Sequence, residues 1–339
     1  MNLKEKILLD DKKNFYKANM HCHTTVSDGR MTPQEVKEHY MANGYSIVAF
    51  TDHHVLVPHP ELKEEAFLPL YGVELNVDEI EGANRANGKT CHFNLIALDE
   101  NNLIQPCYHR EKYMGGNAGN YREQVRFDES LPDYERVYTG ECLTEMMETA
   151  RKQGFFVTYN HPTWSRERYP QYMSYHGMHA LEIINHGSMF SGYEDYNPRV
   201  YDDMLWGGKR IYAVAGDDNH KLADTCGGFT MIKAEALTYP AVASALEKGL
   251  FYASNGPLIH DLWVEDGKIH ITCSGAREIA CHKQMPRRDK VCRAEPDQQV
   301  TEAEFDIAPG DGYVRLTVTD DQGRHAVTNA YFPDQLFGE

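Results

Sequence analysis

Short apolar runs alternate along the chain with polar and amphipathic segments. Five of them end in polar residues: YSIVAFTDHH (45–54), FLPLYGVELN (67–76), GFFVTYNHP (154–162), ALEIINHG (180–187) and RIYAVAGDDNH (210–220). Uninterrupted apolar runs of this length are typical of strands buried on both faces of a parallel sheet. Polar residues at the carboxyl ends of such strands are the pattern of a β/α barrel, whose chemistry lies at that face. A sixth run, CHFNLIAL (91–98), begins with its polar residue instead.

Helix signals separate several of these runs. The motif TPQE forms a capping box, with Thr32 as the predicted N-cap, a proline at the first helical position and Glu35 reaching back. Gly44 is the predicted C′ residue of this helix. The segment GECLTEMMETARKQG (140–154) predicts another helix. Strands joined by helices indicate βαβ units and an α/β fold.

The pattern changes after YPAVASALEKGLFYASNGP (239–257). The later segments alternate apolar and polar residues with a period of two and contain no convincing helix, which is typical of antiparallel strands. We therefore predict a barrel over residues 1–256 and a small antiparallel β domain over residues 257–339.

Residues 105–140 show no clear periodicity. A segment of this length within a compact domain is usually a lid, a binding loop or a mobile connection. Its cationic residues could close over an anionic substrate, but we favour a solvated loop. They include Arg110, Lys112, Arg122 and Arg126.

Composition narrows the possible functions. The chain has 339 residues, 41% of them hydrophobic, which is enough for a large domain and a smaller one. Its formal net charge of −17 argues against a general nucleic-acid-binding surface, because phosphate backbones are bound by clustered Lys and Arg. The charged N-terminal stretch has no signal-like core, and no window suits a membrane span, so we expect a cytoplasmic protein. Eight cysteines without CxxC pairs favour reduced thiols.

The motif HCHTTVSD contains the first candidate metal ligands. Residues two apart on a strand point to the same face, so His21 and His23 would project together while Cys22 faces the core. Imidazole and carboxylate groups suit zinc, iron or manganese, and the groups at the predicted strand ends exceed what one ion needs. We therefore expect two or three divalent ions. The candidate ligands are His21, His23, Asp28, His53, Glu74, His92, His161, Asp218 and His220.

Taken in order, the motifs HCHTTVSD, TDHH, GVEL, CHFNLIAL, NHP and GDDNH resemble the PHP (polymerase and histidinol phosphatase) family of metal-dependent phosphoesterases. The resemblance covers roughly residues 17–256. It implies a distorted seven-stranded (β/α)7 barrel with a metal cluster at the strand ends.

The resemblance also implies how the ligands are divided. One ion would be held by His21, His23, Glu74 and Asp218. Glu74 would bridge to a second ion, which His92 and His161 also hold. Asp28, His53 and His220 would hold a third. Within this cluster we expect the catalytic groups to be Glu74, His161, Asp218 and His220.

Two positions depart from the family pattern. Asp28 stands where some members carry histidine, which leaves the metal at the third position open. In GDDNH, Asp217 replaces the commoner serine. Asp217 could orient a ligand histidine as an acceptor or could cap the strand end.

Several cationic residues closely follow strand ends. They could bind a substrate anion, although solvated positions or backbone contacts are the alternative. His54, beside a ligand, is a further candidate. The predicted substrate-binding residues are Arg166, Arg168, Lys221 and His186.

The sequence thus predicts a metal-dependent phosphoesterase, in which a metal-bound hydroxide attacks a small phosphorylated substrate. The motifs NHPTWS, LEIINHGS and SNGP also resemble a PHP branch that includes a carbamate hydrolase, so hydrolysis of carbamates or other carboxylic esters is an alternative. A non-catalytic PHP module is the third possibility, and the intact ligand set counts against it. Sequence gives no oligomeric state.

Overall fold

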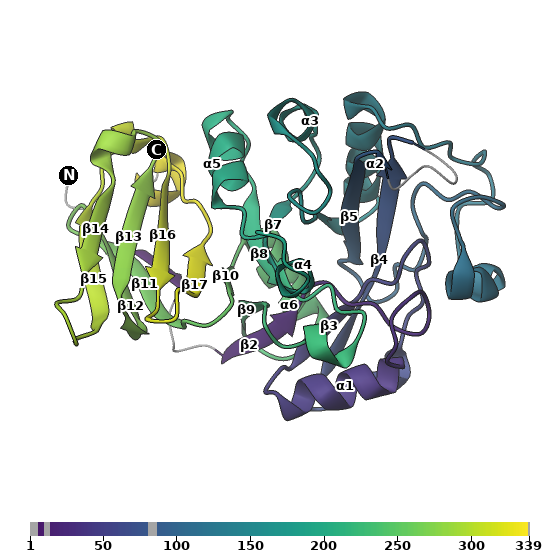
Figure 1. The fold of residues 1–339 in the computed structure, drawn as a ribbon, viewed down its shortest axis with the longest axis horizontal. Helices are drawn as coiled ribbons and strands as arrows, with labels where there is room; N and C mark the ends of the chain where they lie inside the picture. Colours follow the sequence, from purple (N-terminus) through teal and green to yellow (C-terminus); the bar gives the residue numbers. More distant parts are fainter. Residues whose placement is uncertain (1–5, 10–13, 81–86, 338–339) are drawn as a thin grey trace.

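The computed structural model describes residues 6–9, 14–80 and 87–337, so parts of the charged N-terminal stretch lie outside the described residues. Figure 1 shows a barrel beside a smaller β region. Seven strands that follow one another in the chain also neighbour one another in the sheet. They are β2 (Asn14–Asn19), β3 (Ile47–Phe50), β4 (Leu68–Asp78), β5 (Thr90–Ala97), β6 (Phe155–Tyr159), β7 (Ala180–Asn185) and β8 (Tyr212–Gly216). The predicted α/β barrel is confirmed.

Strand direction explains the one run that did not fit the pattern. The pairs β2–β3, β3–β4, β6–β7 and β7–β8 are parallel, whereas β5 is antiparallel to both β4 and β6. The start of β5 therefore lies at the rim where the parallel strands end, and His92 near its start reaches that rim. The barrel closes where a parallel bridge joins Cys22, after β2, to Asn219, after β8.

Helices cover the outside of the barrel, as expected for strands buried on both faces. The first begins at a capping box of Thr32 and Glu35, and Gly44 follows its C-cap with φ +78°, so both sequence signals are confirmed. The helices are α1 (Pro33–Ala42), α2 (Gly140–Lys152), α3 (Tyr169–Ser174), α4 (His186–Phe190), α5 (Pro198–Trp206) and α6 (Tyr239–Lys248). Among the described helices, none is long and apolar enough to cross a membrane.

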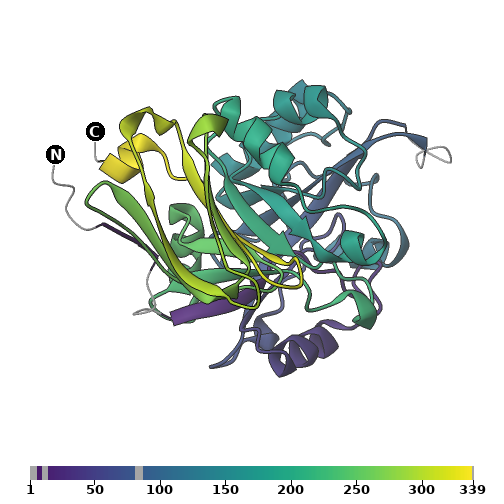
Figure 2. The same ribbon diagram turned by 60° about the vertical axis from the view of Figure 1, so that its left-hand side comes forward.

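Two facing sheets form the smaller region, which Figure 2 shows from the side. One contains β1 (Lys6–Leu9), β11 (Ile259–Glu265), β12 (Lys268–Ala276) and β15 (Val300–Asp306). The other continues the barrel sheet through β9 (Phe229–Ala234) and β10 (Phe251–Ser254) into β17 (His325–Thr328), β16 (Val314–Thr319), β13 (Glu278–Lys283) and β14 (Lys290–Arg293).

The two sheets share one apolar core, with Leu262 and Ile271 on one side and Ile279 and Leu316 on the other. The antiparallel strands confirm the predicted C-terminal β fold. It also contains a short helix, α7 (Pro333–Phe337), which its sequence pattern did not indicate. The N-terminal β1 pairs with β11, although residues 1–256 were assigned to the barrel. The domain boundary at residue 257 stays a prediction.

The aperiodic segment 105–140 packs on the barrel rim. It contains the 3₁₀ helix η3 (Gly116–Gln124), and its residues Tyr108 and Val125 share an apolar cluster with Val26 and Val55 of the rim loops. The guanidinium of Arg122 donates to the backbone carbonyls of Arg110 and Met114. The segment is therefore partly buried rather than freely solvated, and Arg122 is used inside it.

Candidate metal centre

Two imidazoles meet just after the first barrel strand. β2 ends at Asn19, so His21 and His23 lie beyond the predicted strand, in an extended segment held by the Cys22 bridge to Asn219. The segment keeps the alternation, because both imidazoles point to the rim with their Nε2 atoms 3.1 Å apart, while Cys22 packs in an apolar cluster. The predicted pairing of the two histidines is therefore confirmed, although the strand itself is shorter.

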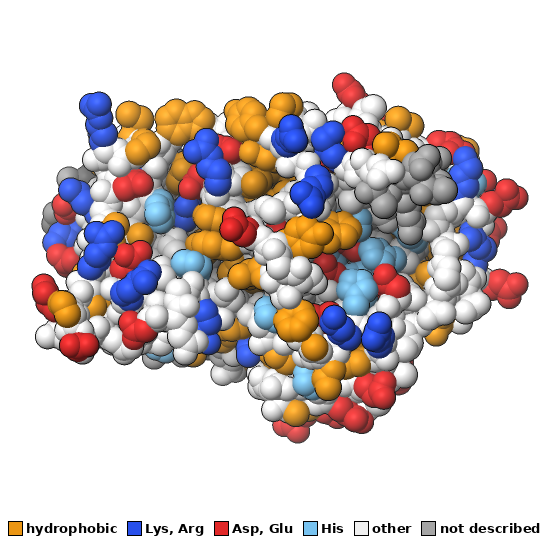
Figure 3. Space-filling model, in the orientation of Figure 1, with side chains coloured by type: hydrophobic (Ala, Val, Ile, Leu, Met, Phe, Trp, Pro, Cys, Tyr) orange, Lys and Arg blue, Asp and Glu red, His pale blue; other side chains and the backbone are white. Residues whose placement is uncertain are grey.

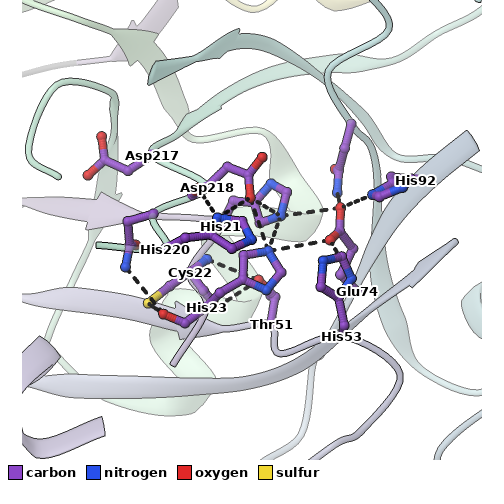
Figure 4. Close-up of polar contacts among 12 residues, drawn as sticks. His21, Cys22, His23, Thr51, His53, Glu74, His92, Asp217, Asp218 and His220 are labelled. Atoms are coloured by element: carbon purple, nitrogen blue, oxygen red, sulfur yellow. Dashed lines mark hydrogen bonds and ion pairs between the residues drawn. The ribbon is translucent and has the colours of Figure 1, made fainter. Parts of the chain in front are cut away.

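Glu74 occupies the middle of the cluster, as Figure 4 shows. Its Oε1 lies 3.1 Å from Nδ1 of His92 and 3.3 Å from Nε2 of His161. Its Oε2 lies 3.4 Å from Nε2 of His23 and 3.1 Å from Nδ1 of His53. One carboxylate thus faces imidazoles from several strand ends.

Asp218 completes this side of the centre. Its Oδ1 lies 3.3 Å from Nε2 of His21 and 3.0 Å from Nε2 of His23. Its backbone has a positive φ of 49°. The side chain comes from the loop after β8, so residues almost two hundred positions apart share one site.

A second group forms around Asp28. Its Oδ2 lies 3.4 Å from Nε2 of His220 and 3.7 Å from Nε2 of His53. The loop before it is anchored by Asp52, whose carboxylate accepts bonds from Thr24 and Ser27. The ligand atoms of His23, Asp28, His53 and His220 lie within 4.8 Å of one another. All nine candidate ligands from the sequence are thus brought together.

The donor set fits divalent cations. Nδ1 of His23, Nδ1 of His53 and Oε2 of Glu74 are buried without a hydrogen-bond partner among the described residues. The 3.1 Å between His53 Nδ1 and Glu74 Oε2 is short enough for a hydrogen bond, but its geometry is not that of one. Buried polar atoms are normally satisfied, and imidazole nitrogens with carboxylate oxygens are the usual ligands of zinc, iron and manganese.

The charges of the centre depend strongly on one another. Burial disfavours imidazolium, yet Asp218 and Glu74 raise the pKa of His23 to about 10. Burial and the neighbouring His23 lower the pKa of His53 to about 3. Against the effect of burial, the surrounding histidines hold the pKa values of Glu74 and Asp218 well below their usual range. The carboxylates are therefore ionised, and protons on imidazoles stand where cations would bind.

A buried carboxylate that the sequence reasoning missed supports this centre. Oε1 of Glu182 lies 3.0 Å from Nδ1 of His21, and Oε2 accepts bonds from the backbone N–H of His161 and from Asn185. A Cβ at Gly216 would lie 2.8 Å from Cβ of His21 and 3.0 Å from Glu182, so glycine permits this close approach. A charged residue inside the apolar run ALEIIN was the available signal.

Asp217 takes the second of its two predicted roles. Its carboxylate accepts bonds from the Tyr40 hydroxyl and from the backbone N–H groups of Cys226, Gly227 and Gly228. It points away from the ligands in Figure 4 and anchors the loop before β9. The alternative prediction, that Asp217 orients a ligand histidine, is therefore wrong.

A cavity of ≈ 660 Å³ opens over the cluster. Figure 3 shows histidine side chains gathered in a hollow on this face, with hydrophobic side chains beside them. Trp164 packs edge-on against the rings of His92 and His161 and forms part of the wall. The lining includes Asp28, His53, His54, His92, Trp164 and Arg166.

Only one of the predicted substrate-binding residues lines this cavity. Arg166 does so, with its guanidinium 5.7 Å from the ring centre of Tyr193. Lys221 lies over the ring of Phe190, and His186 packs against Gly227. Arg168 is exposed at the N-cap of α3, where its backbone N–H donates to the side chain of Gln171. The last three are outside the lining, and their role in binding stays a prediction.

Residues 19–136 match the family model of the PHP domain. This match confirms, over that part of the chain, the family recognised from the order of the motifs. No curated protein matches the chain.

Three solved structures are similar in fold. One is a two-domain protein of Bacteroides vulgatus containing a predicted PHP-like metal-dependent phosphoesterase, with 17% identity, TM-score 0.45 and coverage of 98% of this chain and 99% of that one. A proposed metal-dependent phosphoesterase of Bifidobacterium adolescentis has 17% identity and TM-score 0.42, covering 68% and 96%. An amidohydrolase of Chromobacterium violaceum, with bound sulfate and no metal, has 16% identity and TM-score 0.38, covering 62% and 90%. None of these similarities identifies a substrate.

Proposed function

From the PHP domain over residues 19–136, we infer that this chain is a metal-dependent hydrolase of small phosphate esters. One observation carries the proposal. Nine imidazole and carboxylate side chains converge at the barrel rim, and three of their buried polar atoms have no hydrogen-bond partner among the described residues. Such a set of side chains is best suited to hold metal ions.

Contacts around Glu74 support the division of ligands into a bridged pair and a third position. Glu74 touches His21 and His23 of one proposed site and His92 and His161 of the other. A carboxylate in this position suits a bridge between two ions. Asp28, His53 and His220 gather on the other side of His23 and suit the third.

Bound divalent ions would activate water near neutral pH and neutralise charge on the phosphoryl oxygens. The chain's own residues would bind and orient the substrate. Arg166 is the cation in the cavity lining and would pair with a phosphate oxygen. Trp164 shields His92 and His161 from solvent, which strengthens the electrostatic interactions beneath it.

The proposed partner is a small phosphorylated molecule rather than a nucleic acid or a membrane, in a cytoplasmic protein. The net charge of −17 supports this choice, because it disfavours general attraction to polyanions. Arg166 is the single Arg or Lys among the described residues that line the cavity, which suits an anion of small size.

The test is a hydrolysis screen of the purified full chain with nucleotide, sugar and amino-alcohol phosphates, together with carboxylic ester and carbamate substrates. Elemental analysis of the same sample counts zinc, iron and manganese. We expect phosphate release, lost on chelation, and two or three ions per chain. His21→Ala should lower metal content and activity, whereas His186→Ala should keep its metal. Turnover of carboxylic esters or carbamates alone would overturn the phosphoesterase proposal.

A further inference from the structure

A buried arginine stands directly beneath the cavity wall without an acidic partner. Arg136, in the segment 105–140, is only 6% exposed, and it forms no ion pair with a carboxylate within the described part of the chain. Burying an unpaired charge is expensive, so such a group normally serves a specific purpose. Tyr113 covers it, with its ring centre 4.2 Å from the guanidinium carbon.

The contacts of Arg136 point to one neighbour. Its Nη1 donates to Nδ1 of His54 at 3.0 Å and to the backbone carbonyl of Asn76 at 3.2 Å. A guanidinium has only N–H donors and no acceptor, so Nδ1 of His54 must be the acceptor. The neutral imidazole therefore carries its proton on Nε2.

The backbone of His54 is held as firmly as its ring. Its N–H donates to the carbonyl of Glu74 at 2.8 Å, and its carbonyl accepts from Nε2 of Gln105 at 2.8 Å. The residue has φ +62°, a conformation that costs about 1 kcal/mol or more outside glycine and persists where surrounding contacts enforce it. The imidazole is thus fixed in position beside the metal centre.

His54 lines the cavity, and among the described residues its ring is hydrogen-bonded only through Nδ1, to Arg136. We propose that Arg136 is a positioning residue that holds His54 as the Nε2–H tautomer, and that His54 donates this hydrogen bond to an anionic oxygen of the substrate. The inference rests on the proposed function for the identity of that anion. It gives the segment 105–140 a role in the site through Arg136.

Nuclear magnetic resonance can read the tautomer directly. Full-length protein labelled with ¹⁵N-histidine and loaded with zinc is observed by long-range ¹H–¹⁵N correlation, and His54→Gln identifies the His54 signals by their loss. We expect a proton on Nε2 of His54 and none on Nδ1, and a shift of the Nε2 signal on addition of inorganic phosphate. A proton on Nδ1 of His54 would overturn the proposal. So would phosphate that shifts other histidine signals but leaves the His54 signals unchanged.

Kinetics with p-nitrophenyl phosphate separate positioning from a merely structural role. His54→Leu should lower kcat/KM roughly 10- to 100-fold, as expected for loss of one hydrogen bond to a charged group, whereas His54→Gln retains a donor and most of the activity. Arg136→Met should lower kcat/KM by no more than His54→Leu does. The double variant should have a kcat/KM no lower than that of His54→Leu alone. Additive losses would refute a role through His54.

Arg122→Met is the matched control, because Arg122 belongs to the same segment and binds only backbone carbonyls. It should leave the His54 tautomer unchanged. If Arg136→Met does not fold, the wild-type tautomer and its response to phosphate still decide the question. If the wild type hydrolyses no phosphate ester, the proposed function fails, while the tautomer measured in wild type and Arg136→Met judges the positioning role separately.

Discussion

Nδ1 of His21, in the candidate metal centre, lies 3.0 Å from Oε1 of Glu182, and both side chains are buried. This contact fixes the imidazole so that Nε2 faces Glu74 and Asp218. A carboxylate in this position orients a ligand and raises its basicity. The centre therefore extends one layer below the residues that would touch metal.

Glu182→Gln tests this layer. The amide NH2 of glutamine cannot accept hydrogen bonds from the N–H groups of His161 and Asn185 as the carboxylate does. We therefore expect metal affinity to fall roughly 10- to 100-fold while the protein stays folded. Competition with a chelator measures the affinity. Glu167→Gln is the matched control, because Glu167 is also buried but is bound by tyrosine hydroxyls such as that of Tyr138. Equal losses in the two variants would contradict the assignment.

Asp28→Ala should remove one ion and leave the pair bridged by Glu74. The reason is that Asp28 contacts His53 and His220 from the open side of the cluster, away from His92 and His161. Elemental analysis counts the ions, and anomalous scattering places them. A carboxylate is a harder ligand than imidazole, so Asp28→His should favour zinc at that position. Loss of all ions from Asp28→Ala would refute an independent third site.

Arg166→Gln should lower kcat/KM for a phosphate ester roughly 10- to 100-fold, mainly through KM, because it removes the proposed charged hydrogen bond to the substrate phosphate. Metal content should not change. Arg168→Gln provides the comparison, since Arg168 lies two residues away but outside the cavity lining. Steady-state kinetics of both variants decide the matter, and similar effects would place the anion elsewhere.

Without metal, the stability of the protein should decrease as the pH becomes alkaline. Although burial opposes it, Asp218 and Glu74 raise the pKa of His23 to about 10 and that of His161 to about 9, above the value of about 6.5 in an unfolded chain. The stabilisation by these protons is complete below about pH 6.5 and is lost as the pH rises through 9 to 10.

We therefore expect the Tm of chelator-treated protein to fall between pH 7 and pH 10. Saturating zinc should flatten this dependence, because metal-bound imidazoles carry no proton to lose. Differential scanning calorimetry of both forms measures it. A metal-free Tm that rises over the same window would show that the sign is wrong.

An ion pair with a buried arginine joins the barrel to the C-terminal sheets. Asp202 of α5 accepts bonds of 2.7 and 2.6 Å from Nε and Nη2 of Arg315 on β16, which is 2% exposed. Asp202→Ala would leave this arginine unpaired and should lower the free energy of unfolding by about 3 kcal/mol. Urea denaturation measures the change. Metal content should stay the same, and Asp202→Ala combined with Arg315→Met should recover part of the loss.

The sequence by itself determined the inventory of the centre. Apolar runs ending in polar residues predicted barrel strands with ligands at one rim, because the ends of parallel strands meet there. The spacing of His21 and His23 predicted their shared direction, since alternate residues of an extended chain face the same way. These are local properties, so they can be read from neighbouring residues.

Only the tertiary structure decided the rest. His92 reaches the rim because β5 runs antiparallel, and β1 joins the C-terminal sandwich because it pairs with β11; both depend on strand pairing between distant segments. In the sequence, Glu182 and Arg136 could not be distinguished from ordinary buried or solvated charges. The fold places Glu182 beside His21 and Arg136 beside His54. Long-range packing selects which atoms face one another, and no local pattern of residues contains that information.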